Sequence, residues 1–399
     1  MIKIKKRRSP MPIYRESGYQ KRLQPLSHTE RVLWVAAPVL LLFILGIIFL
    51  ARQDSSWVER YYSLGFYPAW SGFLSALTGR LHFSFAQWLV IAFALCCATF
   101  VLVFIIQLIK GSSNRGQIVL RFFMRALSAA TVLLLLFTMG GGLNYYRYSF
   151  TRYSGLTVRP SEVSQLGELC GELVKEANTL RQGLQEDAQG VATFAPATPW
   201  ELSKTANSSY SALTAQNSQW KQLFQAAEQV PPKPVLFSEA MSYMQIVGFF
   251  FPYTIEANVN IHTSDMDIPN AMCHELAHIA GFMREDEANF IAYLACRSSE
   301  DPFFRYSGVM LALIHSSNAL YSANTALYTQ VMNGLSPAVL RDMSADAAYY
   351  AKYDTKFGDF SNAVNDTYLK ANDQQDGVAG YGRMVDLLLA DYRSRKGIS

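Results

Sequence analysis

The 399-residue sequence predicts an α-helical membrane anchor of three transmembrane helices, followed by a mainly α, α+β domain. Two observations predict this architecture. Hydrophobic residues make up 50% of the chain and charged residues only 17%, which is too apolar for an ordinary soluble protein. The excess lies before residue 144, whereas the remainder has the helical spacing and short alternating segments of a domain in water.

Three apolar stretches are each long enough to cross about 30 Å of hydrocarbon. They cover residues 33–51, 86–109 and roughly 119–141. The first is interpreted as a retained anchor, because no small-residue cleavage signal follows its long apolar run. Arg121 and Arg125 lie near the start of the third stretch and can snorkel to the membrane interface. Residues 33–143 are therefore expected to form the transmembrane region.

The distribution of basic residues predicts the orientation of the anchor. The tail of residues 1–32 and the loop around residues 110–121 are rich in Lys and Arg, whereas the first loop balances Arg60 and Arg80 with acidic residues. Basic loops stay in the cytoplasm, so the domain of residues 144–399 is expected outside. The net charge of +4 reflects this tail and gives no reason to expect a nucleic-acid partner.

The loop at residues 55–85 is rich in aromatic residues. Aromatic side chains favour the boundary between membrane and water, so one or two short interfacial helices are expected here.

Residues 274–278 read HELAH, which is the HExxH pattern. On a helix, His274 and His278 share one face and can both bind one Zn²⁺, while Glu275 is placed to act as a general base. Gly281 then supplies a stop for the helix. The motif predicts a zinc site with His274 and His278 as ligands.

A catalytic zinc usually has three protein ligands, so a third is expected nearby. On a helix that begins near Arg284, the side chains of Glu285 and Asn289 share one face. Glu285 is the expected third ligand, with Asn289 hydrogen-bonded to a ligand histidine. Glu287 remains an alternative ligand, because the step from His278 is short and the phase of the helix is inferred.

HELAH followed by E-x-x-A-N resembles the gluzincin metallopeptidases. More narrowly, the layout resembles a bacterial family of three-span membrane proteins with an extracytoplasmic HExxH domain. The resemblance implies a zincin-like domain in a bacterial cytoplasmic membrane, zinc bound by His274, His278 and Glu285, and hydrolysis of a peptide or protein substrate with Glu275 as base. The sequence departs from the thermolysin-like pattern in its short spacing to Glu285 and in having Asn289 where Asp is common.

Three other classes are weighed against this hypothesis. A metzincin would need a third histidine where Arg284 stands, and an intramembrane protease would need an apolar stretch around the motif that polar residues interrupt. A non-catalytic zinc-binding sensor remains the alternative, although such a site would not need Glu275.

The rest of the domain is expected to be mostly helical, with helices at 161–185, 203–229, 307–332, 336–351, 360–372 and 378–395. Residues 234–269 favour strands, and the segment Glu256–His262 is expected to be either an edge strand for substrate or an internal hairpin strand. His262 is expected to be a polar strand residue.

Four further residue choices stay open. His315, Tyr381 and Arg383 are candidates for stabilising a transition state, although no spacing rule connects them to the zinc. Cys273 and Cys296 fall on the two site helices and could be either a disulfide or buried thiols.

Overall fold

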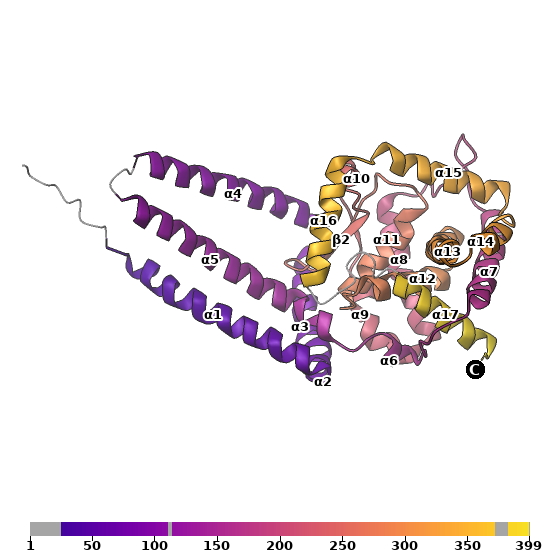
Figure 1. Ribbon diagram of the computed structural model, residues 1–399, viewed down its shortest axis with the longest axis horizontal. Helices are drawn as coiled ribbons and strands as arrows, with labels where there is room; N and C mark the ends of the chain where they lie inside the picture. Colours follow the sequence, from indigo (N-terminus) through magenta and orange to yellow (C-terminus); the bar gives the residue numbers. More distant parts are fainter. Residues whose placement is uncertain (1–24, 111–113, 372–381, 399) are drawn as a thin grey trace, which may run out of the picture.

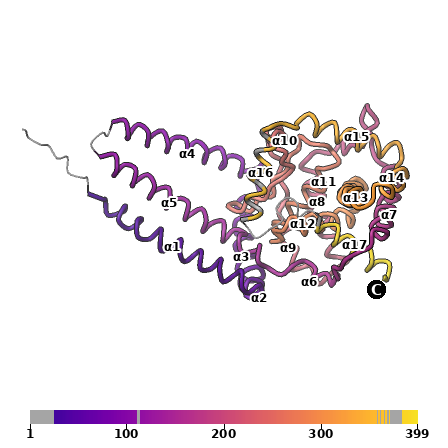
Figure 2. Tube along the Cα trace, viewed as in Figure 1, coloured from indigo at the N-terminus to yellow at the C-terminus, as the bar shows by residue number. Residues whose placement is uncertain are grey.

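The computed structural model describes residues 25–110, 114–371 and 382–398. Three long helices, α1 (His28–Gln53), α4 (Phe85–Lys110) and α5 (Arg115–Gly140), extend to one side of a helical domain (Figures 1 and 2). Each is long and apolar enough to cross a membrane, which confirms that the three predicted stretches are helices of the required length and composition. The tail of residues 1–24, with most of the basic residues used to predict orientation, lies outside the described residues.

The first span begins at a complete cap. The hydroxyl of Ser27 accepts from Glu30 N at 3.1 Å, and the Glu30 carboxylate accepts from Ser27 N at 3.0 Å. The same carboxylate lies 3.1 Å from Arg125 and 3.4 Å from Arg121 on α5. Arg121 and Arg125 lie near the start of the third span, and both pair with the first span through Glu30.

The first loop forms a chain of short helices on the domain side. They are α2 (Ser55–Trp57), the π-helical η1 (Val58–Phe66) and α3 (Tyr67–Thr78). Short helices were expected here, but they are also part of the domain, because buried Glu59 pairs with Arg147 and buried Tyr67 donates to the carbonyl oxygen of Ile279.

The remaining helices build the domain. They are η2 (Gly142–Tyr146), α6 (Thr151–Ser154), α7 (Val163–Arg181), α8 (Pro199–Gln216), η3 (Ser218–Trp220), α9 (Lys221–Gln229), α10 (Ser238–Tyr243), α11 (Asp267–Ile279), α12 (Glu285–Ser298), α13 (Pro302–Ala323), α14 (Thr325–Met332), α15 (Pro337–Lys352), α16 (Lys356–Ala371) and α17 (Gly382–Lys396). The predicted helices at 203–229 and 307–332 are each divided into two, because Asn217 and Asn324 leave the helical conformation.

A small sheet lies beside α11. Its strands are β1 (Lys233–Pro234), β2 (Gly248–Phe251) and β3 (Glu256–Val259), in the order β1-β3-β2. β3 pairs in parallel with β1 and antiparallel with β2, and all four of its residues are buried. The expectation that Glu256–His262 is an edge strand is therefore wrong, because β3 is central and ends before His262. β1 and β2 hold the two edges of this sheet instead.

The core is built around α11, α12 and α13, which pack on one another. Aromatic side chains fill the space between these helices and α8–α9. Phe150 makes edge contacts with Phe282 and Trp220, and Phe224 lies next to both Phe282 and Tyr210. This packing holds α11 and the turn that follows it.

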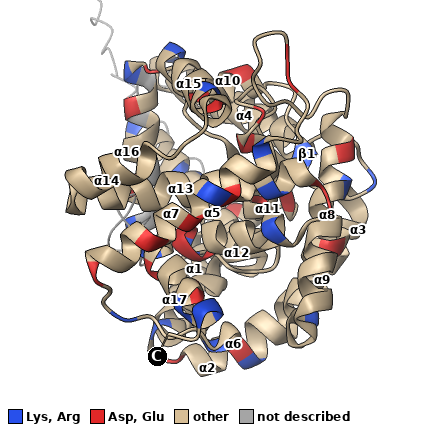
Figure 3. Cartoon of the chain, turned by 90° about the vertical axis from the view of Figure 1, so that its right-hand side faces the viewer, with Lys and Arg blue, Asp and Glu red and all other residues tan. Residues whose placement is uncertain are grey.

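Charges on the domain are mixed. Figure 3 shows basic and acidic segments interspersed over its helices, as expected for a surface in water.

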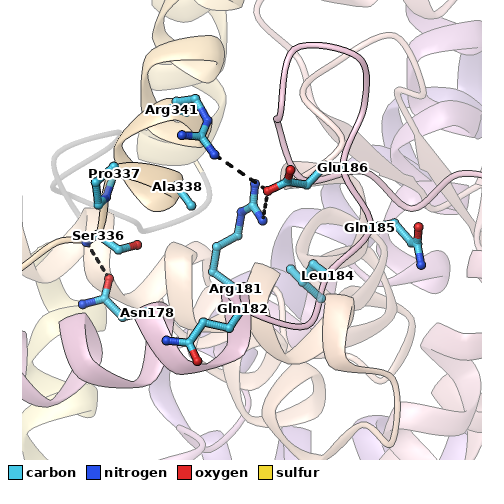
Figure 4. Close-up of a pocket in the computed structure, with 10 residues that line it drawn as sticks. All are labelled: Asn178, Arg181, Gln182, Leu184, Gln185, Glu186, Ser336, Pro337, Ala338 and Arg341. Carbon is cyan, nitrogen blue, oxygen red and sulfur yellow. Dashed lines mark hydrogen bonds and ion pairs between the residues drawn. The ribbon is translucent and has the colours of Figure 1, made fainter.

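A pocket between the end of α7 and the start of α15 is shown in Figure 4. Its buried Arg181 lies 2.6 Å from Asp342 and 2.9 Å from Glu186, so this arginine is neutralised within the chain.

Candidate metal centre

The helix α11 carries the HELAH residues on its last two turns. It ends at Ile279, and Gly281 follows with a φ of 87°, a left-handed conformation that favours glycine. A side chain at Gly281 would also meet the amide of Asn144 and the guanidinium of Arg147, at 2.8 and 2.9 Å from an added Cβ. The predicted helix stop is therefore confirmed, and it allows the chain to return as α12.

Three potential ligand atoms converge where α11 and α12 face each other. Nε2 of His274 lies 3.2 Å from Oε2 of Glu285, and Nε2 of His278 lies 3.6 Å from Oε1 of the same carboxylate. One ligand atom from each of the three residues lies within 4.8 Å of the others. Two imidazoles and one carboxylate are a donor set that suits Zn²⁺ and leaves one position open.

Each of the two histidines is oriented by a hydrogen bond at its Nδ1 atom. Nδ1 of His274 donates to Oδ1 of Asn289 at 2.7 Å, and Nδ1 of His278 donates to the carbonyl oxygen of Phe282 at 2.7 Å. With their Nδ1 protons committed to oxygen acceptors, both rings present Nε2 toward Glu285. The expected place of Asn289, one turn after Glu285 and against a histidine, agrees with this geometry.

The pKa values describe a site in which Glu285 keeps its charge. Burial lowers the pKa of His274, but the hydrogen bond and charge of Glu285 outweigh burial and raise that pKa to about 9. Burial lowers the pKa of His278 to about 4. Burial raises the pKa of Glu285, yet the two histidines bring it below its ordinary value. The raised pKa of His274 favours a proton on its Nε2, which would place a positive charge beside the Glu285 carboxylate.

Glu275 is buried beside this cluster, with 3% of its surface exposed. Its Oε2 atom is buried and has no hydrogen-bond partner among the residues that the structure describes. Burial, and secondarily the charge of Glu285, raises the pKa of Glu275 to about 8, although the charge of His274 opposes this shift. An unpartnered buried carboxylate oxygen is costly, so it indicates a group with a function.

The edge strand β2 begins against Glu275. An added Cβ at Gly248 would lie 2.6 Å from Oε1 of Glu275, so only glycine allows this approach. Two residues further on, the ring of Phe250 lies 6.3 Å from the ring of His278. Neither residue was predicted from the sequence, although a glycine at the start of the strand-like run GFFF is typical of a strand that approaches another group closely.

Glu287, the alternative ligand, lies outside the cluster. Its Oε1 atom accepts from the backbone nitrogen of Phe150 at 2.9 Å and pairs with Arg284 at 3.3 Å. This carboxylate fastens the start of α12 to the segment that follows the third span.

The other candidate residues lie at different distances from the metal centre or outside the described residues. His315 on α13 lies within electrostatic range of His274, which together with burial, the larger cause, lowers its pKa. Arg383 lies near Asp286 at the start of α12, and Tyr381 lies outside the described residues. His262 is exposed and lies next to Tyr349.

The two cysteines of the site helices are free thiols, buried against each other. Burial, and next the neighbouring Cys273, raises the pKa of the Cys296 thiol. Both side chains are fully buried, as is typical of thiols that pack in a core.

A family model described as "Protein of unknown function (DUF3810)" matches residues 62–389. The match spans the loop helix α3, the second and third spans and every residue of the candidate metal centre. No curated protein and no solved structure matches the chain.

Proposed function

We propose that this chain, which belongs to the family described as "Protein of unknown function (DUF3810)", is a membrane-anchored zinc-dependent metallopeptidase. We place its zincin-like domain outside a bacterial cytoplasmic membrane, where it hydrolyses peptide bonds. The observation that carries the proposal is the convergence of His274, His278 and Glu285 next to Glu275, a buried carboxylate with an unpartnered oxygen.

Zinc held by the three ligands would supply a Lewis acid that polarises the substrate carbonyl and lowers the pKa of water toward 7. Glu275 would accept a proton from the attacking water at its free Oε2 and later deliver it to the leaving amine. Asn289 would hold His274 in the tautomer that binds metal. His315, which interacts with the charge of His274 and whose lowered pKa favours the neutral ring, would be a candidate for stabilising the oxyanion.

Substrate would bind in extended form along β2. This strand is at the edge of the sheet and begins 2.6 Å, measured from an added Cβ of Gly248, from the carboxylate of Glu275. A peptide that adds to the edge by main-chain hydrogen bonds would therefore bring its scissile bond to the catalytic base.

A non-catalytic zinc sensor is the second candidate. It is favoured by the direct contact between α11 and the loop helix α3, because this contact could transmit a change on metal binding to the spans. It does not explain why a carboxylate is buried without a partner at Glu275.

Metal analysis and peptide cleavage by the full-length protein separate the two candidates. The expected result is one zinc per chain in wild type and in Glu275→Gln, cleavage of a peptide library by wild type alone, and loss of zinc in His274→Ala and His278→Ala. Zinc in both proteins with cleavage by neither would favour the sensor. Unchanged zinc in both histidine variants would refute the site.

Orientation is tested separately by reporter fusions. A fusion after Leu143 is expected outside and one near Ser113 inside. The opposite pattern would place the domain in the cytoplasm and refute the proposed location.

A further inference from the structure

The sheet that borders the candidate metal centre is bound to the outer end of the second span. The carboxylate of Glu256 accepts hydrogen bonds from the first residues of α4, from Phe85 N at 3.0 Å and Ala86 N at 2.9 Å. Lys233 pairs with this carboxylate at 2.6 Å and donates to the carbonyl oxygen of Thr78 at 2.6 Å. Both charged side chains are fully buried. Breaking such a pair is strongly destabilising, so the position of the sheet relative to the start of α4 is fixed.

The same sheet rests on the outer end of the third span. Gly140, the last residue of α5, lies so close to Pro252 that an added side chain would collide with its carbonyl oxygen. Gly141 follows with a φ of 149°, and an added Cβ there would lie 2.8 Å from Met283 and 3.2 Å from Phe250. The turn after β2 and the turn between the two site helices both touch the point where α5 ends.

The strand β2 therefore runs from the catalytic carboxylate to the membrane boundary. Gly248 is at Glu275, and Pro252, four residues later, is at Gly140. At about 3.3 Å per residue, the path between them is about 13 Å. The metal centre is thus a few residues of extended chain away from the end of a membrane span.

The outer edge of β2 offers main-chain groups along this path. Asn260 N donates to Val247 O at 2.8 Å, and residues of an antiparallel pair alternate between bonding their partner and pointing away from it. Gly248 and Phe250 are therefore the residues whose N–H and C=O groups face outward. In the described part of the chain, no strand pairs with β2 on that side.

Exposed apolar side chains indicate where this region lies relative to the membrane. Phe237, which is 50% exposed, meets the ring of Trp88 in the first turn of α4 at 6.0 Å. Leu236 is 64% exposed and adjacent to it. Exposed aromatic and aliphatic side chains at the start of a span are typical of the membrane interface.

We infer that the substrate of this site is the membrane-proximal segment of a protein or peptide anchored in the same bilayer, bound along β2 and cut within a few residues of the membrane surface. The inference rests on the proposed function, because it identifies the substrate of the proposed peptidase. An occupant antiparallel to β2 would carry its anchor on the amino-terminal side of the cut, since such a chain runs from Pro252 toward Gly248.

The test uses full-length protein in vesicles of phosphatidylethanolamine and phosphatidylglycerol. One degenerate fluorogenic peptide library is supplied in three forms: free, palmitoylated through a spacer of about three residues, and palmitoylated through a flexible spacer of about fifteen. The two lipidated forms have the same membrane concentration, so they are matched controls. The anchor is placed at either end of the peptide in separate samples.

We expect the short-spacer form to be cut at least tenfold faster than the long-spacer form, with cuts within about eight residues of the lipid. A second measurement uses Glu275→Gln carrying a photoreactive residue in place of Phe251, which should cross-link peptide residues next to the lipid.

The outcomes distinguish the two proposals. Equal cleavage of all three forms would overturn the substrate class and leave the peptidase standing. Ordered cross-links without any cleavage would overturn the peptidase and support the membrane-proximal binding path. Absence of both cleavage and cross-links would overturn both.

Discussion

The hydroxyl of Tyr67 donates a hydrogen bond to the carbonyl oxygen of Ile279 at 3.1 Å. A helix of the first loop thus caps the carboxyl end of the helix that carries both histidines. Nearby, buried Arg147 donates to Ala280 O at 3.0 Å and pairs with Glu59 at 3.0 Å. The loop between the first two spans is therefore part of the support of the metal centre.

Glu59→Ala should destabilise the domain although Glu59 belongs to a loop between spans. The substitution leaves the buried guanidinium of Arg147 without its partner, which typically costs about 3–5 kcal/mol. Chemical unfolding of the full chain in detergent, followed by tryptophan fluorescence, measures the loss. The neighbouring Arg60 is exposed, so Arg60→Ala is the matched control. Equal stability of the two variants would show that the loop does not support the domain.

Glu285→Ala should lower zinc affinity, whereas Glu287→Ala should lower the stability of the domain. The first removes a proposed ligand and should lower zinc affinity by orders of magnitude, because two histidines alone make a poor chelate. The second removes the acceptor of Phe150 N and the partner of Arg284, so it should lower stability and keep one zinc per chain. Metal analysis after dialysis against a weak chelator separates them. Release of zinc by Glu287→Ala alone would exchange their roles.

The sequence predicted the parts of the molecule that depend on local spacing. Runs of apolar residues fixed the three spans, and the i, i+4 step of HELAH placed His274 and His278 on one face. The face shared by Glu285 and Asn289 followed from the same rule, because α12 begins at Glu285 without an irregular turn.

Long-range pairing could not be predicted in this way. The alternation in β3 indicates a strand but does not show whether its edge is free, and β1 occupies that edge through only two residues, Lys233 and Pro234. No local pattern marks so short a strand. Lys233 donates to the carbonyl oxygen of Thr78, and Glu256 accepts from the backbone of the first residues of α4. These partners are more than 150 residues apart in the sequence, so the place of the sheet against the spans was also not predictable.

Asn289→Ala should weaken zinc binding or activity by about 10–100-fold without unfolding the domain. Asn289 accepts the Nδ1 proton of His274 at 2.7 Å, and groups that orient a ligand histidine typically have effects of this size. Competition with a fluorescent zinc chelator measures the affinity. Asn289→Asp keeps an acceptor and serves as the control, so it should retain zinc. An unaffected alanine variant would show that this hydrogen bond does not orient the ligand.

The stability of the metal-free protein should fall between about pH 4 and pH 7 through Asp267. Burial, and next the neighbouring Asp346, raises the pKa of Asp267 to about 7, and Tyr350 donates to it at 2.6 Å. The folded state therefore holds a proton that the unfolded chain releases near pH 4, and this contribution is lost as pH rises through 7. Asp267→Asn should flatten the dependence and be the more stable protein at pH 8. Thermal unfolding in chelator at pH 5 and 8 tests this, with exposed Glu300→Gln as control. An unchanged slope in Asp267→Asn would contradict it.

Gly248→Ala should lower the turnover of the proposed peptidase while zinc stays bound. The added methyl would lie 2.6 Å from Oε1 and 2.9 Å from Cγ of Glu275, so either the carboxylate or the strand must move. Glu275 is not a proposed ligand, so one zinc per chain is expected to remain. Since a displaced base is poorly placed to accept a proton, the loss should appear in kcat more than in KM. Gly171→Ala on α7, where nothing lies within 4 Å of an added Cβ, is the control. Normal turnover in Gly248→Ala would show that the position of β2 against Glu275 does not matter for the reaction.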